Sequence, residues 1–175
     1  MNAKERFYNR YFGPRGLVTA VRVSLYRENT ATALALICAC VESMTYLGLL
    51  ECSDVVCSHD FAAWVRKYLQ PARIGVSPED LWSVRNALLN GYVAQRSISR
   101  SPKPREILFA WGKYYISEGM QLDPGSKWHQ VMTIRADELY KSLVRAAEEF
   151  GAGYISESEN ERIVGARLNK IFGNR

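Results

Sequence analysis

Apolar residues recur at helical spacing through most of this chain, and most strongly between residues 30 and 50. One stripe there is formed by residues three or four positions apart: Ala33, Ile37, Val41, Met44 and Leu47. Leu34, Leu36 and Cys38 widen this stripe. The pattern predicts a central helix that is buried on most of its sides.

Shorter helical patterns occupy much of the remaining chain. We expect further helices over residues 3–12, 61–69, 138–150 and 157–172, and one that starts at Pro78 and ends near Asn90-Gly91. Ser77, Asp60 and Asp137 precede three of these helices and are good N-cap residues. Residues 16–27 fit both a strand and a helix, because Val18, Val21, Val23 and Leu25 partly alternate while Leu17, Val21 and Leu25 repeat every four positions.

Two short extended runs, residues 107–111 and 131–134, are separated by turn residues such as Asp123-Pro124-Gly125. They predict a small antiparallel hairpin with a long connection. The predicted architecture is mainly α, with one domain over residues 1–175 and the hairpin between the motif helix and the C-terminal helices. It divides into a basic N-terminal segment, core helices, a basic loop with the hairpin, and C-terminal helices: 1–29, 30–95, 96–135 and 136–175.

Composition narrows the class of protein without naming a function. The 175 residues are 47% hydrophobic and 23% charged, which is typical of a folded globular domain and argues against a disordered chain. The basic, aromatic N-terminus does not resemble a secretory signal, and the apolar runs are short, so we expect no membrane-spanning helix and a cytoplasmic location.

The net charge of +5 is unevenly distributed. Residues 1–27 carry six Lys and Arg against Glu5 alone, whereas residues 28–60 carry five acids and no Lys or Arg. A second basic segment contains Arg96, Arg100, Lys103 and Arg105. These basic segments are candidate phosphate-contacting surfaces, because Arg and Lys neutralise the nucleic-acid backbone; solvated surface charge is the alternative.

Metal and nucleophile chemistry have little support in the sequence. Cys52, Cys57 and His59 form a C-x4-C-x-H pattern without the second ligand pair of a typical zinc site. The only other histidine is His129, and no glycine-rich phosphate loop or serine-hydrolase motif is present. We therefore expect no metal and no cofactor.

Two charged residues lie within apolar helical patterns and need partners. Arg85 occurs in the motif Leu81-Trp82-Ser83-Val84-Arg85-Asn86, and Glu42 is isolated in the predicted central helix. A charge on an apolar helical surface must find a partner or water. We therefore predict an ion pair between Glu42 and Arg85 across the two helices.

The motif around Arg85 resembles the HEPN family of helical domains, many of which are RNA-cleaving toxins or nucleotide-binding modules. The family signature is an Arg, often followed by a polar residue, and a His four to six positions later near a helix end. Arg85 and Asn86 match the first part, while Asn90 stands where the His would be. The helix that contains Glu42 is similar to the one that packs against the family's motif helix, and the resemblance covers roughly residues 30–150.

The resemblance implies a HEPN-like bundle that binds RNA or a nucleotide, with a candidate site of Arg85, Asn86 and Asn90 supported by Glu42. In the family, the Arg stabilises phosphate charge and the His supports attack by a 2′-hydroxyl, usually at a homodimer interface and without metal. Asn90 does not titrate near neutral pH and cannot act as a general base. We therefore expect binding with degenerate or absent ribonuclease activity.

Two other function classes remain open. The lack of a complete catalytic set and the four tryptophans, Trp64, Trp82, Trp111 and Trp128, also fit a non-catalytic dimeric interaction or regulatory module. An enzyme that uses Glu42, Tyr or Cys in a helical pocket is the third alternative, and a pocket that contains Glu42 would support it.

Overall fold

A computed structural model describes most of the chain. The described residues are 1–49, 53–69, 76–89, 106–110 and 131–173. The predicted helix end at Asn90-Gly91 and the basic loop 96–105 lie outside them.

The described part of the chain is mainly helical, which confirms the predicted fold class at that level. Its helices are α1 (Ala3–Phe12), α2 (Leu17–Tyr26), α3 (Thr30–Leu47), α4 (Ser58–Trp64), α5 (Pro78–Leu89), α6 (Ala136–Ala152) and α7 (Ser158–Phe172). A π-helical turn, η1 (Val65–Leu69), continues α4, and a 3₁₀ turn, η5 (Tyr154–Ser156), precedes α7. The two strands are β1 (Glu106–Ala110) and β2 (Val131–Arg135).

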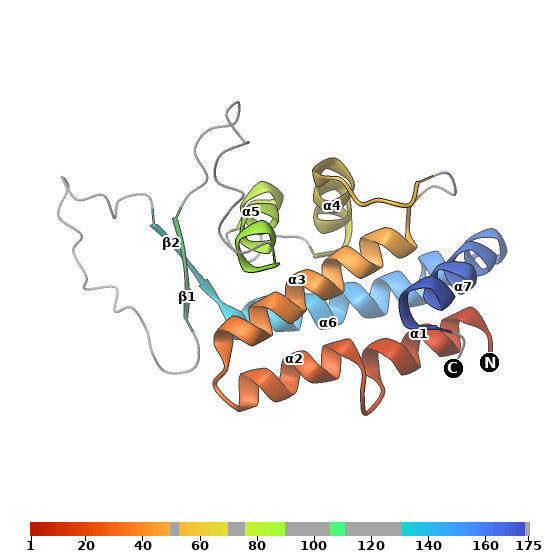
Figure 1. The fold of residues 1–175 in the computed structure, drawn as a ribbon, viewed down its shortest axis with the longest axis horizontal. Coiled ribbons are helices and arrows are strands. Elements are labelled where there is room, and N and C mark those ends of the chain that lie inside the picture. The colour runs from red at the N-terminus through yellow and green to blue at the C-terminus, as the bar shows by residue number, and fades with distance from the viewer. Residues whose placement is uncertain (50–52, 70–75, 90–105, 111–130, 174–175) are drawn as a thin grey trace.

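Helix α3 lies at the centre and contacts α2, α4, α5, α6 and α7. In Figure 1, α3 and α6 run side by side, α1 and α2 follow one another along one edge, and α4 and α5 lie beyond α3 on the opposite side. The large side chains that are almost fully buried come from α1, α3, α4, η1, α6 and η5: Phe7, Tyr11, Ile37, Met44, Leu47, Phe61, Leu69, Leu139, Leu143, Phe150 and Ile155. The core therefore forms around α3, as its apolar pattern predicts.

Residues 17–26, which fit two patterns in the sequence, form helix α2. Val18, Val21 and Leu25 are buried at helical spacing, whereas Val23 is 44% exposed. A strand would have placed Val21, Val23 and Leu25 on one face. Packing against α3 therefore selects the helical alternative.

Helix α5 begins as the sequence predicts. The Ser77 hydroxyl accepts a hydrogen bond from the Asp80 backbone N–H at 3.0 Å, and the Asp80 carboxylate accepts from the Ser77 backbone N–H at 3.2 Å. This reciprocal capping box satisfies two backbone donors that the first turn leaves without helical partners. It fixes the start of the helix that carries Arg85.

Two predicted N-caps are displaced along the chain. Helix α4 starts at Ser58, so Asp60 is the third helical residue, and its carboxylate accepts from the Cys57 backbone N–H at 3.1 Å. Helix α6 starts at Ala136, so Asp137 lies in its first turn, and Arg135 Nη2 donates to it at 2.7 Å. Both carboxylates still stabilise the positive, N-terminal end of a helix. They do so from its first turn and are not N-cap residues.

The predicted antiparallel hairpin is wrong, because β1 and β2 pair in parallel, with Glu106 opposite Val131 and Ala110 opposite Arg135. Twenty residues connect these strands in the sequence. A parallel pair needs a connection of about a dozen residues or more, whereas an antiparallel pair needs only a short turn. The long connection therefore favoured a parallel pair, although the turn residues within it suggested a hairpin.

Helix α3 is long and apolar enough to cross a membrane by length and composition alone. The reason is an apolar run from Ala33 to Val41. Half of the helix is buried inside the protein, and the core helix of a soluble protein passes the same test.

Glu28 is the described non-glycine residue with a positive φ, at 58°. It ends α2: its N–H donates to Leu25 O, and the Asn29 N–H donates to Ser24 O, which is the hydrogen-bond pattern of a Schellman motif. Glycine is favoured at this position because a Cβ destabilises the left-handed conformation. The carboxylate also lies at the negative end of the helix.

We expect Glu28→Gly to raise the free energy of unfolding by about 1 kcal/mol, because it removes the left-handed strain. Urea denaturation of the variant and the parent protein measures the change. Glu28→Gln is the matched control, since it removes the charge and keeps the strained backbone. An equal gain in both variants would assign the effect to charge and contradict the backbone explanation.

Candidate functional site

The predicted ion pair between Glu42 and Arg85 is present. Arg85 Nε donates to Glu42 Oε2 at 2.9 Å, and Arg85 Nη2 forms a second bond, to Glu42 Oε1. The Arg85 side chain is 16% exposed and that of Glu42 is 26% exposed. This two-point contact links α5 to the one charged position of α3, and its geometry is the favourable one for a guanidinium and a carboxylate.

Arg85 also organises its own helix. Its Nη1 donates to Asn86 Oδ1 at 2.9 Å, and its guanidinium carbon lies 5.0 Å from the centre of the Trp82 ring. Phe61 of α4 lies 5.2 Å from Trp82, measured between ring centroids. Trp82, Arg85 and Asn86 therefore form one cluster. It contacts Glu42 of α3 through Arg85, and Phe61 of α4 through Trp82.

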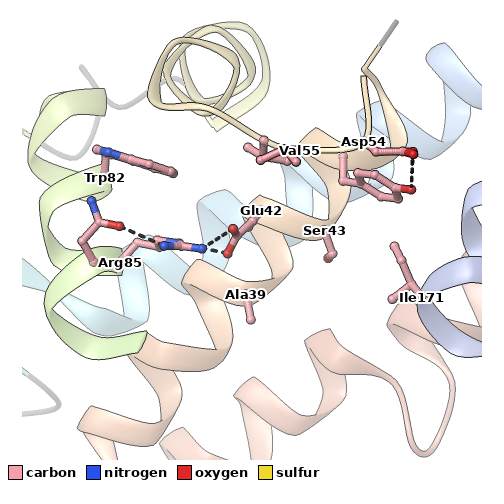
Figure 2. Close-up of a pocket in the computed structure, with 11 residues that line it drawn as sticks. Ala39, Glu42, Ser43, Asp54, Val55, Trp82, Arg85 and Ile171 are labelled. Carbon is pink, nitrogen blue, oxygen red and sulfur yellow. Dashed lines mark hydrogen bonds and ion pairs between the residues drawn. The ribbon is translucent and has the colours of Figure 1, made fainter. Parts of the chain in front are cut away.

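An open groove of about 640 Å³ lies beside this cluster. Its lining comes from α3, α5, α7 and the segment before α4: Ala39, Glu42, Ser43, Tyr46, Asp54, Val55, Val56, Trp82, Arg85, Asn86 and Ile171. Figure 2 shows the Glu42–Arg85 pair between α3 and α5, with Val55 and Ile171 farther along. The groove thus combines apolar walls with a small set of polar groups that converge, as small-molecule sites do.

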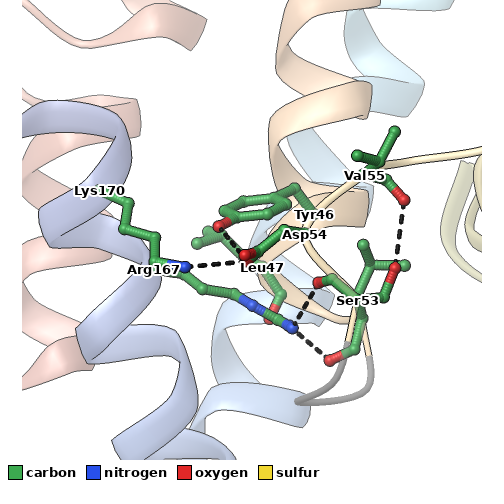
Figure 3. Close-up of polar contacts among 8 residues, drawn as sticks. Tyr46, Leu47, Ser53, Asp54, Val55, Arg167 and Lys170 are labelled. Carbon is green, nitrogen blue, oxygen red and sulfur yellow. Dashed lines mark hydrogen bonds and ion pairs between the residues drawn. The ribbon is translucent and has the colours of Figure 1, made fainter.

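The far wall of the groove depends on Arg167 of α7, which is only 4% exposed. Its guanidinium donates to the backbone carbonyls of Leu47 at 3.4 Å and Ser53 at 3.1 Å, and also to that of Leu49 at 2.5 Å. Its guanidinium carbon lies 5.2 Å from the centre of the Tyr46 ring. Figure 3 shows Arg167 reaching from α7 toward the end of α3 and the segment that carries Ser53.

The same face of α7 carries Lys170, whose Nζ lies 2.8 Å from Asp54 Oδ1. The Tyr46 hydroxyl donates to that oxygen at 3.4 Å. The hydrogen bond from Lys170 and its charge lower the pKa of the Asp54 carboxyl. We define Arg167 and Lys170 as the α7 clamp, because together they hold residues 53 and 54 against α7.

Sequence reasoning missed Arg167. The inward face of α7 carries the apolar residues Val164 and Leu168, which are buried. Arg167 lies three positions after Val164 and one before Leu168, so helical spacing places it on that inward face. An Arg at an inward position was the available signal, as it was for Arg85.

The structure brings together three of the predicted site residues, namely Glu42, Arg85 and Asn86. Asn90, Arg96, Arg100, Lys103, Arg105, His129 and Cys52 lie outside the described residues. Cys57 and His59 are exposed at the start of α4. Within the described ranges, no three His, Cys, Asp or Glu side chains are grouped closely enough to hold a metal ion.

Thiol chemistry is disfavoured at the two buried cysteines of α3. Burial raises the pKa of both the Cys38 and the Cys40 thiols to about 12. A thiol with such a pKa remains protonated at neutral pH and is a poor nucleophile. These residues pack as small apolar side chains in the core, as their positions in the sequence suggest.

Comparisons with protein-family models, with curated proteins and with solved structures found no match for this chain. The fold and the groove therefore define its class: a mainly helical protein with an open groove beside a partly buried Arg–Glu pair.

We expect removal of either Glu42 or Arg85 to destabilise the protein by about 1–3 kcal/mol, because the remaining charge would be left partly buried without its partner. The variants Glu42→Gln, Arg85→Gln and their combination form a double-mutant cycle, read by urea denaturation. The two changes are expected to couple by at least about 0.5 kcal/mol.

The matched control is the ion pair between Arg66 and Glu79, whose side chains are 56% and 62% exposed. Exposed pairs contribute little, so the same cycle there is expected to give a smaller coupling energy. Equal coupling energies in the two cycles would contradict a special role for the pair in the groove.

Arg167→Lys is expected to lower the free energy of unfolding by about 2–4 kcal/mol, because one ammonium cannot reach three separate carbonyls in the geometry that a guanidinium provides. Lys170→Met, at the exposed end of the clamp, is the control and is expected to change stability by less than about 0.5 kcal/mol. Similar losses in both variants would show that Arg167 acts only as a surface charge.

Proposed function

We propose that this chain is a HEPN-like RNA-binding protein that acts without catalysis, in the cytoplasm. The observation that carries the proposal is the solvent face of α2 and of the turn before it, where Arg15, Arg22 and Arg27 are exposed and Tyr26 is 88% exposed. We call these four residues the α2 basic face.

The burial pattern of α2 explains why these side chains face water together. Val18, Val21 and Leu25 are buried, and α2 packs against α1, α3 and α6. Arg22 and Tyr26 are one helical turn apart, on the side that the buried stripe leaves to solvent. No acidic residue occurs between Glu5 and Glu28, so α2 itself carries no carboxylate.

This combination of groups is suited to single-stranded RNA. Arginines bind backbone phosphates and release counterions, while an exposed aromatic ring offers a surface on which an unpaired base can stack. The same proposal includes phosphate contacts from the second basic segment, which would extend the basic surface. Its residues are Arg96, Arg100, Lys103 and Arg105.

Arg85 has a different role in this proposal. Both of its contacts to Glu42 would have to be exchanged before it could bind a phosphate, so its primary role is to position the motif helix. Asn90, in place of the family histidine, supplies no general base. A binding protein without ribonuclease activity fits both features better than an active ribonuclease does.

A homodimeric interaction module is the second candidate. Exposed apolar side chains near the groove favour it, because Val55 is 76% exposed and Ile171 is 37% exposed. Apolar surface of this kind is common where proteins meet. Light scattering that shows a stable dimer, together with no RNA binding at low salt, would favour this candidate over the first.

We expect the protein to bind a labelled single-stranded RNA in fluorescence anisotropy, with an affinity that falls between about 50 and 200 mM salt. Replacing Arg15, Arg22 and Arg27 by Ser should weaken binding and reduce the magnitude of the slope of log K against log salt by about 2, because about 0.7 is lost per phosphate contact on a single strand.

The charge-matched control replaces Arg66, Lys141 and Arg162, which are exposed on other elements, by Ser. This control should bind RNA nearly as well as the parent protein. The proposal fails if both triple variants bind equally, or if the parent protein does not bind at low salt.

A further inference from the structure

The segment before α4 forms one wall of the groove and has no helix or strand of its own. Ser53 is its first described residue, and Cys57 at its other end is the N-cap of α4. We call residues 53–57 the strap and residues 54–56 its tip. Asp54, Val55 and Val56 of the tip line the groove, so a movement of the tip changes the width of the groove.

Both ends of the strap are held by contacts that are costly to break. The Ser53 carbonyl accepts a hydrogen bond from Arg167 at 3.1 Å, and this buried guanidinium also binds two carbonyls at the end of α3. At the other end, the Cys57 backbone N–H donates to the Asp60 carboxylate at 3.1 Å, in the capping box that begins α4. Hydrogen bonds to charged groups are stronger than neutral ones, so these two residues are the fixed points of the strap.

The tip is held by weaker contacts than the ends. The Asp54 carboxylate pairs with Lys170 at 2.8 Å, but the two side chains are 71% and 60% exposed. The Tyr46 hydroxyl donates to the same carboxylate at 3.4 Å, which is long for a hydrogen bond between oxygens. Figure 3 shows Lys170 reaching from α7 to Asp54, beside Tyr46 of α3. Exposed ion pairs contribute little to stability and are screened by salt, so the tip can separate from α7 while both ends stay in place.

The apolar side chains of the tip oppose its separation only to a small extent. Val55 is 76% exposed, whereas Val56 is partly buried and packs against the core. The Ser53 hydroxyl donates to the Val55 carbonyl at 3.2 Å, which helps the tip to keep its shape when it moves. Displacement of the tip therefore exposes mainly the buried part of Val56, and the loss of hydrophobic burial is small.

The two cations of the α7 clamp therefore differ in their roles at the strap. Arg167 is buried and fixes one end, whereas Lys170 is exposed and makes a contact that can be broken and remade. The hydrogen bond from Lys170 lowers the pKa of the Asp54 carboxyl, so the pair stays charged at neutral pH. Ionic strength, which screens exposed charges, is then the condition to which the tip responds.

We propose that the tip of the strap opens and closes one wall of the groove, with the Asp54–Lys170 ion pair as its latch and Ser53 and Cys57 as its fixed ends. Opening removes the tip residues from the wall and widens the groove toward Tyr46, which lines it as well. The strap is thus a salt-sensitive gate built into the fold. This inference goes beyond the proposed RNA binding and does not depend on it, since α2 contributes no residue to the groove.

Alkylation of a thiol placed at the tip measures the opening. Val56→Cys is made in a protein in which Cys52 and Cys57 are replaced by Ser, while the two cysteines of α3 stay because they are buried. Iodoacetamide is uncharged, so its reaction rate reports access to the thiol. We expect Lys170→Met to raise this rate about two- to fivefold at low salt, which matches the contribution of an exposed ion pair. Salt at about 1 M should raise the rate while Lys170 is present and change it little in the Lys170→Met protein.

Two controls accompany this measurement. Val55→Cys in the same background tests position, because Val55 is already exposed when the latch is closed, and its rate should not change with Lys170→Met. Lys141→Met tests charge, because it removes an exposed ion pair with Glu138 on α6, and it should leave the rate at Val56→Cys unchanged. The proposal is overturned if Lys170→Met leaves that rate unchanged, if it raises the rates at both positions equally, or if Lys141→Met has the same effect.

The methyl resonances of Val56 provide a second measurement that leaves this side chain unchanged. Lys170→Met, Asp54→Asn and added salt should shift these resonances in one direction, because all three move the same equilibrium between closed and open tips. The combined variant Asp54→Asn/Lys170→Met should give no further shift, since the latch is already broken in either single variant. Resonances that do not move overturn the proposal even if the Val56→Cys protein fails to fold. RNA enters none of these measurements, so their outcome is independent of the proposed function.

Discussion

The constraint on which the fold depends is the need to cover α3. This helix is apolar on nearly every side, and nine of its residues are buried. No single neighbour can bury such a helix, so five other helices pack around it. Glu42 is the exception on this apolar surface, and the groove opens beside it. The same helix thus organises the core and places its one charged residue in the wall of the groove.

Arg85 and Arg167, at the two ends of the groove, both bind oxygen atoms of α3 or of the segment that follows it. Arg85 reaches from α5 to the one carboxylate of α3, and Arg167 reaches from α7 to carbonyls at and beyond the C-terminus of α3. Carbonyls at a helix end lack helical partners and are a favourable place for a cation. Both guanidiniums also lie over aromatic rings of the groove, Trp82 and Tyr46. Polar contacts therefore hold the groove open between apolar layers.

The α2 basic face and the groove differ in their charge. The α2 basic face is an exposed, positively charged edge, whereas the lining of the groove contains two carboxylates, Glu42 and Asp54, and one cation, Arg85. Helix α3 separates these two surfaces, since α2 packs on one of its sides and α5 on another (Figure 1).

The sequence alone was sufficient for the mainly helical class and for most helix boundaries, because apolar spacing, capping residues and glycines act locally. It was also sufficient for the Glu42–Arg85 pair, since each residue was an isolated charge in an apolar pattern and needed a partner. Local signals could not choose between strand and helix for residues 17–26, nor predict the parallel pairing of β1 and β2. Packing against α3 decided the first, and long-range strand contact decided the second. Only the tertiary structure revealed Arg167 as the clamp of the groove wall, because its carbonyl partners are more than a hundred residues away in the chain and become neighbours only when α7 packs against α3.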